Sequence, residues 1–258
     1  MTAAAPARTL TDEGTTWGDP SGQALDIDSW SDTAITFTVP APSGSNGAVR
    51  VWPGTAASVS VVNSSGTTLG ETPVLEITPS STLSDYYNDT GISDNSDPQA
   101  ANFDTDGDSY SAEALAAAGL NPGGAFTADG VSLTWPDVPG GQPDMILPLG
   151  QTIALTGSGT TLVFAGAGHH TTSGTGVITY TDGTTQRFTL GYPDWEDNTA
   201  PSGGGILVTL PYINGTNGQV TKEASVYWYA VSLEPGKTVQ DVTLPNDNSL
   251  RVFTLGVG

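Results

Sequence analysis

The sequence predicts an all-β fold made of two tandem β-sandwiches with one short helix. Short runs of β-branched and aromatic residues recur with period-two alternation, and clusters of Gly, Pro, Asn, Asp and Ser separate them. Asp outnumbers Glu by 20 to 7, and Asp favours turns and caps over helix surfaces. The 33 Gly and 18 Pro among 258 residues also fit a chain rich in turns.

The individual elements follow from local patterns. Runs 176–180 and 186–190 flank Asp182-Gly183, a pair that favours a tight hairpin turn. Residues 111–118 predict the one helix, with Ser109 or Ser111 as N-cap and Gly119 at its end. The predicted strands are 34–39, 57–62, 74–78, 131–135, 160–164, 176–180, 186–190, 224–231, 239–244 and 250–255.

A change in composition near residues 79–82 predicts a domain boundary. A small polar stretch follows the strand predicted at 74–78, and sequence dense in Asp and Asn comes next. Residues 1–79 carry a net charge of −6 and residues 80–258 a net charge of −15. We therefore predict two domains, 1–79 and 80–258.

Charge and composition exclude several classes of function. The net charge is −21, with only six Lys and Arg, so nucleic acid is not an expected partner. No apolar run is long enough to span a membrane. The chain has no Cys and therefore no disulfide, thiolate metal site or thiol nucleophile. Residues 1–6 lack the basic start and apolar stretch of a signal peptide, and we interpret the chain as a fragment excised from a longer protein.

Three motifs in the first domain suggest a family: IDSWSDTAITFTVP at 27–40, VSVVNSSG at 59–66 and LEIT at 75–78. Together they resemble the IPT/TIG immunoglobulin-like domain over about residues 8–79. The resemblance implies an immunoglobulin-like sandwich that serves as a spacer or platform beside another module.

The second domain has its own motifs: YNDTGISD at 87–94, ANFDTDG at 101–107, SYSAEALAAAG at 109–119, the segment 129–137 and the ending VFTLGVG at 252–258. Over roughly 83–258 the sequence is similar to an accessory β-sandwich of secreted glycoside hydrolases from high-GC Gram-positive bacteria. The resemblance implies a galactose-binding-like jelly roll, a secreted or cell-surface location, and a catalytic domain in the same parent chain as a partner.

Residues 85–108 form an acidic segment with seven carboxylates and no basic residue. Such a segment either recruits a cation or remains a solvated loop with Asx turns ahead of the helix. Calcium suits its oxygen ligands best, but the glycine spacing and the missing acid at the twelfth position exclude an EF-hand. We expect calcium, in a structural role, at Asp94, Asp97, Asn102, Asp104, Asp106 and Asp108.

Aromatic residues in two turn contexts, at 192–198 and 211–218, suggest a carbohydrate site. Sugars lay an apolar face on an aromatic ring while Asp and Asn side chains bind their hydroxyl groups. In the alternative interpretation Trp195 ends a strand and plugs the end of the sandwich. The predicted ligand-binding residues are Tyr192, Asp194, Trp195, Tyr212 and Asn214.

The sequence shows no catalytic constellation. His169 and His170 have no Cys or further His to complete a zinc site, no Gly-x-Ser-x-Gly motif is present, and Glu196 and Glu223 lie in no recognisable catalytic context. We therefore expect non-catalytic carbohydrate-binding or accessory modules, stabilised by calcium. The alternatives are a structural or adhesive spacer that packs against a catalytic domain or partner protein, and an enzyme that uses two carboxylates.

Overall fold

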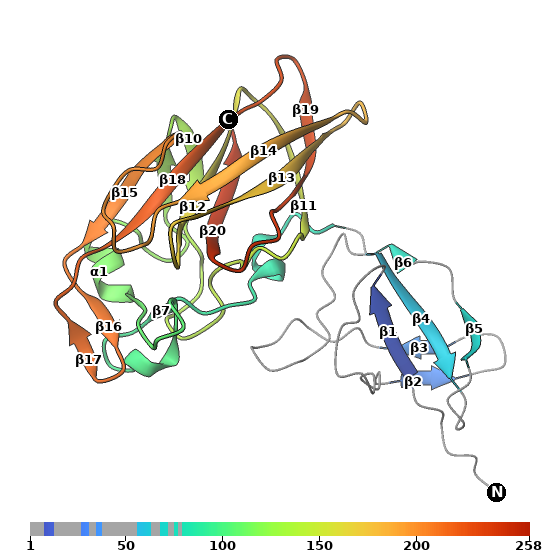
Figure 1. Ribbon diagram of the computed structural model, residues 1–258, viewed down its shortest axis with the longest axis horizontal. Coiled ribbons are helices and arrows are strands. Elements are labelled where there is room, and N and C mark those ends of the chain that lie inside the picture. The colour runs from blue at the N-terminus through green and yellow to red at the C-terminus, as the bar shows by residue number, and fades with distance from the viewer. Residues whose placement is uncertain are drawn as a thin grey trace, which may run out of the picture. The chain divides into compact units, whose positions relative to one another are not determined.

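The computed structural model describes residues 79–258 throughout and, before them, only the strand segments within residues 8–76 (Figure 1). The chain divides into two compact units, Met1–Pro79 and Ser80–Gly258. The predicted IPT/TIG motifs at 27–40, 59–66 and 75–78 lie partly outside the described residues. Among the described residues, no helix has the length and apolar character needed to cross a membrane.

The first unit contains two small groups of antiparallel strands. In one group β4 pairs with β1, β5 and β6, and in the other β2 pairs with β3. The strands are β1 (Arg8–Asp12), β2 (Ile27–Trp30), β3 (Ile35–Phe37), β4 (Ala56–Val62), β5 (Thr68–Glu71) and β6 (Leu75–Glu76).

The second unit is a sandwich of two four-stranded antiparallel sheets. The first sheet has the order β11-β19-β13-β14, and the second has the order β15-β18-β12-β20. The strands are β11 (Thr152–Ser158), β12 (Thr161–Gly168), β13 (Thr172–Tyr180), β14 (Thr185–Tyr192), β15 (Gly204–Leu210), β18 (Ala224–Ser232), β19 (Thr238–Thr243) and β20 (Leu250–Val257).

Period-two alternation places the core between these sheets. In β14, Phe188, Leu190 and Tyr192 are buried while residues between them are more exposed, as expected of a strand with one face inward. Phe188 stacks on Phe164 of β12, with ring centroids 5.4 Å apart. The β13–β14 hairpin turns at Asp182-Gly183, where Gly183 has φ +80°, a left-handed conformation that glycine adopts at little cost.

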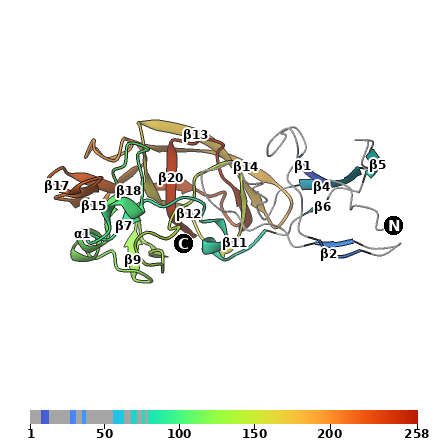
Figure 2. The ribbon, with the colours of Figure 1, turned by 90° about the horizontal axis from the view of Figure 1, so that it is seen from below.

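A third layer covers the outer face of the second sheet. Strands β9 (Ala125–Ala128) and β10 (Val131–Thr134) form a hairpin. Val131 and Leu133 of this hairpin pack against Val163 and Ala165 of β12. Figure 2 shows β9 on the side of β12 and β18 that faces away from β13. Strand β12 is therefore buried on both faces.

Short elements surround the acidic segment. They are η1 (Leu83–Tyr86), β7 (Ile92–Ser93), η2 (Pro98–Ala100), β8 (Tyr110–Ser111), α1 (Ala112–Ala117), β16 (Ile213–Gly215) and β17 (Gly218–Val220). Helix α1 begins after Ser111, whose Oγ accepts a hydrogen bond from the Ala114 amide at 3.1 Å. The predicted β-sandwich character and the one short helix are confirmed, whereas β9, β11 and β15 were not predicted as strands.

Candidate functional site

An open cavity of about 680 Å³ lies where the end of β14 meets β18 and the loop between β14 and β15. The beginning of β13 completes its wall. Six of the lining residues are Thr or Ser, and no Lys, Arg or His of the described residues lines it. The lining residues are Thr171, Thr172, Ser173, Thr189, Gly191, Tyr192, Pro193, Asp197, Thr199, Pro201, Ser202 and Tyr229.

Tyr192 is the buried aromatic residue of this cavity. It is 2% exposed, and its ring centroid lies 6.4 Å from that of Tyr229, with the two rings nearly perpendicular. Its hydroxyl group is buried and has no hydrogen-bond partner among the described residues. Burial raises the pKa of this hydroxyl well above its usual value, so it keeps its proton and remains a donor. A buried hydroxyl without a partner is costly for the fold.

Three threonine hydroxyls in the wall donate their protons to protein oxygens. Thr171 Oγ1 donates to Asp197 Oδ2 at 3.1 Å, and Thr172 Oγ1 donates to Asp247 Oδ2 at 2.7 Å. Thr199 Oγ1 donates to the Asp197 carbonyl at 3.1 Å. Because each hydroxyl has only one proton, these oxygens have only lone pairs left to offer a ligand.

The loop after β14 is held by hydrogen bonds within the loop and to β12 and β18. The Trp195 amide donates to the Gly168 carbonyl at 2.9 Å, and Asp194 Oδ1 accepts from the Glu196 amide at 2.9 Å. Asn198 has φ +50°, and its Oδ1 accepts from Ser225 Oγ at 2.6 Å. These bonds fix the position of Asp197 in the cavity wall.

Trp195 does not present its ring to a ligand. It is 1% exposed and packs within an aromatic cluster, 4.8 Å from Phe103 and 4.9 Å from Tyr110 between ring centroids. The sugar-stacking role predicted for Trp195 is therefore wrong, and its burial agrees with the alternative, in which the indole ring is a plug. The physical reason is that rings from two distant segments, residues 103–110 and Trp195, pack together and exclude solvent.

The other predicted ligand-binding residues have structural partners. Asn214 is fully buried, and its Nδ2 donates to the carbonyl and Oγ of Ser93. The Tyr212 hydroxyl accepts from Asn95 Nδ2 at 3.2 Å. The Asp194 carbonyl accepts from the Tyr227 hydroxyl at 2.9 Å. Of the five predicted residues, Tyr192 lines the cavity and Asp194, Trp195, Tyr212 and Asn214 do not.

Three carboxylates, those of Asp104, Asp108 and Glu196, converge in the same unit. Each offers an oxygen, and these oxygens lie within 4.8 Å of one another. Two of the residues belong to the predicted calcium segment, and the third comes from the loop after β14. Asp104 Oδ1 also accepts from the amides of Asp106 and Asp108, at 2.9 and 3.1 Å, so the segment folds around one carboxylate. We call Asp104, Asp108 and Glu196 the acidic triad.

The remaining predicted calcium ligands are not part of the triad. Asp94 and Asp97 frame a turn in which the Asp97 amide donates to the Asp94 carbonyl at 3.0 Å. Asn102 Oδ1 accepts from the Gly107 amide at 3.0 Å, and the side chain of Asp106 is exposed. Only Asp104 and Asp108 of the six predicted residues therefore lie in the convergent group.

Lys222 lies beside the acidic triad. Its ammonium group forms an ion pair with Glu196, and this hydrogen bond is the main cause that raises the pKa of Lys222. Burial and the charge of Asp104 raise the pKa of Asp108, while Lys222 acts in the opposite direction. Lys222 supplies one positive charge beside three carboxylates, so the acidic triad keeps an excess of negative charge.

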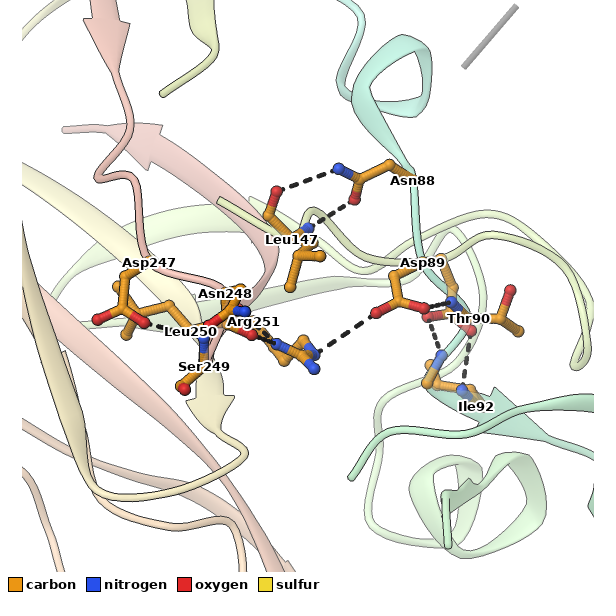
Figure 3. Close-up of polar contacts among 12 residues, drawn as sticks. Asn88, Asp89, Thr90, Ile92, Leu147, Asp247, Asn248, Ser249, Leu250 and Arg251 are labelled. Atoms are coloured by element: carbon orange, nitrogen blue, oxygen red, sulfur yellow. Dashed lines mark hydrogen bonds and ion pairs between the residues drawn. The ribbon is translucent and has the colours of Figure 1, made fainter. Parts of the chain in front are cut away.

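A second polar group lies deeper in the domain, around Arg251 (Figure 3). Arg251 is 2% exposed, and its Nη1 donates to the carbonyls of Asn248 and Leu250 at 2.6 and 3.1 Å. Its Nε lies 3.7 Å from Asp89 Oδ2. Burial lowers the pKa of Arg251, and the negative charge of Asp89 opposes this effect. We assign this pair a role in stability because the Arg251 side chain is buried.

The two histidines stack on each other with ring centroids 4.0 Å apart. His170 Nδ1 lies 3.6 Å from Asp194 Oδ2, and His170 is exposed. Burial and the neighbouring His170 lower the pKa of His169. Neither histidine belongs to the acidic triad.

Sequence reasoning missed most of the cavity wall. Asp197 and Tyr192 lie in the region that the aromatic pattern indicated, but Tyr229 comes from β18, and Thr171 and Thr172 lie just before and at the start of β13. The alternation in 226–230 placed Tyr227 and Tyr229 on one face, and this was the available signal for Tyr229. Glu196 carried no local signal that linked it to Asp104.

The fold and the site define a class: a two-sheet β-sandwich domain with a hydroxyl-lined cavity beside one strand end. The chain belongs to the family described as AziU2-like beta-sandwich domain, whose family model matches residues 79–258. No curated protein matches the sequence. The family match establishes the sandwich, while the links to IPT/TIG domains and glycoside hydrolases belong to the proposal that follows.

Proposed function

We propose that residues 80–258 form a non-catalytic domain that binds a carbohydrate in the cavity beside β14. The observation that carries this proposal is a cavity of about 680 Å³ whose wall combines six Thr or Ser residues with Asp197 and the half-buried ring of Tyr229. The side chains of Asp197 and the hydroxyl residues can form hydrogen bonds with the hydroxyl groups of a sugar.

The cavity has the size and chemistry that a sugar needs. Its volume of about 680 Å³ falls within the usual range for small-molecule sites. Tyr229 is half-buried and supplies an aromatic ring, while Asp197 and the hydroxyl residues supply hydrogen-bonding groups. A sugar needs this combination because its rings have apolar C–H faces and polar edges.

Calcium is part of the same proposal. The acidic triad offers three carboxylate oxygens, which is the ligand type that calcium prefers. Glu196 of the triad precedes Asp197 of the cavity wall in the chain. A cation held by Asp104, Asp108 and Glu196 would therefore hold the loop that shapes the cavity, although Lys222 competes for Glu196.

The sequence resemblances support a proposal for the parent protein, which is a secreted bacterial glycoside hydrolase with this chain as an accessory module. In this proposal residues 1–79 form an IPT/TIG-like immunoglobulin domain that acts as a spacer, and a galactose-binding-like jelly roll follows it. The expected location is the cell exterior or cell surface. The expected partners are a carbohydrate and a catalytic domain of the same parent chain.

Affinity electrophoresis of the full chain in gels that contain single polysaccharides tests the proposal, with calcium and with chelator. Asp197→Ala removes the exposed carboxylate of the cavity wall and should weaken retardation. Asp129→Ala is the matched control, because Asp129 is an exposed carboxylate that does not line the cavity. Retardation that survives Asp197→Ala unchanged would contradict the assigned site.

The structural spacer remains the second candidate. A second cavity of about 520 Å³ between residues 82–87 and β10 supports it, since half-buried Leu83 and Val138 give part of its wall apolar surface. A spacer of this kind would show no retardation by any polysaccharide and would form a stable complex with a catalytic domain. An enzyme that uses two carboxylates would instead require an activity that one Asp or Glu substitution removes.

A further inference from the structure

We propose that the cavity beside β14 selects a hydroxylated primary amine in its protonated form, such as an amino sugar without an N-acetyl group. This inference rests on the proposed function and deepens it by naming the charge class of the ligand. It depends on two features of the wall: the direction in which its hydroxyl groups donate, and the sign of the charges around it.

The hydroxyl groups make the wall rich in acceptors. Thr171 and Thr172 each direct their proton to a carboxylate, and a carboxylate can only accept. Thr199 directs its proton to a backbone carbonyl. A ligand therefore meets oxygen lone pairs at three places in the wall. An ammonium group matches such a wall well, because it carries three donors and no acceptor.

The carboxylates in and beside the cavity wall give it a negative charge. Asp197 is the charged residue among those that line the cavity, and its side chain is exposed. Asp247 stands behind Thr172, and Asp194 lies three residues before Asp197 in the same loop. A negative potential in a concave site concentrates cations and repels anions.

The exposed His170 precedes Thr171 of the wall and lies 3.6 Å from Asp194. The Lys and Arg side chains of residues 79–258 are engaged elsewhere or lie outside the cavity. Lys222 pairs with Glu196, Lys237 pairs with Glu234 and Asp182, and Arg251 is buried near Asp89. Arg187 is exposed on β14 but does not line the cavity. A uronate, sulfate or phosphate group would therefore enter this site without a counter-charge.

The aromatic residues fit the same ligand class. The half-buried Tyr229 ring lines the cavity and could contact either a sugar face or an ammonium group. A ligand with both a sugar ring and an ammonium group therefore matches the aromatic ring and the acceptors of the wall.

Isothermal titration of the full chain with three matched oligosaccharides tests this inference. The probes are oligomers of glucosamine, of N-acetylglucosamine and of galacturonic acid, at low salt and near neutral pH. We expect the glucosamine oligomer to bind about ten-fold more tightly than its acetylated counterpart, as one lost charge-assisted hydrogen bond would give. We expect no binding of the galacturonic acid oligomer.

Asp197→Asn keeps the shape of the side chain and removes its charge. It should weaken binding of the glucosamine oligomer about five-fold more than it weakens binding of the acetylated oligomer, which is the scale of an exposed ion pair. Asp129→Asn is the matched control, since Asp129 is an exposed carboxylate in the β9–β10 turn. Added salt and a pH at which the amine is deprotonated should both reduce the preference.

The outcomes separate this inference from the proposed function. Equal affinity for the first two oligomers, with Asp197→Asn silent, would overturn the amine preference and leave carbohydrate binding intact. If the galacturonic acid oligomer bound more tightly than the glucosamine oligomer, the inference that the cavity selects a cation would be overturned. No heat or retardation with any polysaccharide would overturn both proposals.

Discussion

Arg251 Nε and Asp89 Oδ2 lie 3.7 Å apart and connect the last strand of the domain to the segment that precedes β7. Asp89 also accepts from the Thr90 amide at 3.0 Å, and Arg251 binds two carbonyls of its own loop (Figure 3). Residues separated by more than half of the chain thus share one polar group inside the fold.

Replacing Arg251 by Met should lower the free energy of unfolding by about 3 kcal/mol, because the carbonyls of Asn248 and Leu250 lose their donor and Asp89 loses this cation. The side chain of Asp89 is 32% exposed, so the loss of stability should lie at the lower end of the range for a broken buried ion pair. Urea unfolding measures the change. Arg187→Met is the control, since Arg187 is exposed, and an equal loss in that variant would contradict the assignment.

Asp144 should make the domain less stable as the pH rises. Its carboxylate is 1% exposed and accepts from the Gly91 and Ile92 amides. Burial raises the pKa of Asp144 well above the usual 3.8, and these two bonds act in the opposite direction. The folded domain therefore binds this proton more tightly than the unfolded chain does. The contribution is fully present below about pH 4 and is lost as the pH rises through the folded-state pKa.

Urea unfolding between about pH 4 and pH 8 tests this sign when the wild type is compared with Asp144→Asn. The stability of the wild type relative to the variant should fall as the pH rises, because the variant has no proton to lose at this position. A difference that stays constant over the range would show that Asp144 keeps its ordinary pKa.

Trp195→Ala should destabilise the domain by about 3–5 kcal/mol, since it removes a buried ring and leaves a cavity between Phe103 and Tyr110. Trp195→Phe should recover part of this loss. Thermal unfolding followed by near-ultraviolet circular dichroism measures both. A fully stable Trp195→Ala variant that loses only ligand binding would restore the sugar-stacking role.

Calcium at a hundredfold excess over its Kd should raise the Tm by about 5 °C or more, because it binds the folded domain alone. Asp104→Asn should abolish the shift. Asp106→Asn should preserve it, since Asp106 belongs to the same segment but not to the acidic triad. The same loss of the shift in both variants would assign the effect to overall charge, and no shift in the wild type would remove calcium from the proposal.

Local sequence patterns determined the elements of the fold. Cap preferences predicted Ser109 or Ser111 at the start of the helix, and the structure has Ser111 there. Asp182-Gly183 predicted the β13–β14 turn, because turn preferences depend on a few neighbouring residues. Alternation predicted the inward face of β14 for the same reason. Strands β11 and β15 escaped prediction because their glycines and weak alternation leave little local signal.

The tertiary structure decided which side chains meet. Nothing near Glu196 in the sequence points to Asp104, and nothing near Tyr229 points to Thr171, yet the fold brings both pairs to shared sites. It also decided that Trp195 joins a buried aromatic cluster while Asp197 lines a cavity, although both residues lie in one short segment. Periodicity, turns and caps are set by near neighbours, whereas burial and convergence depend on strands that pair across the whole domain.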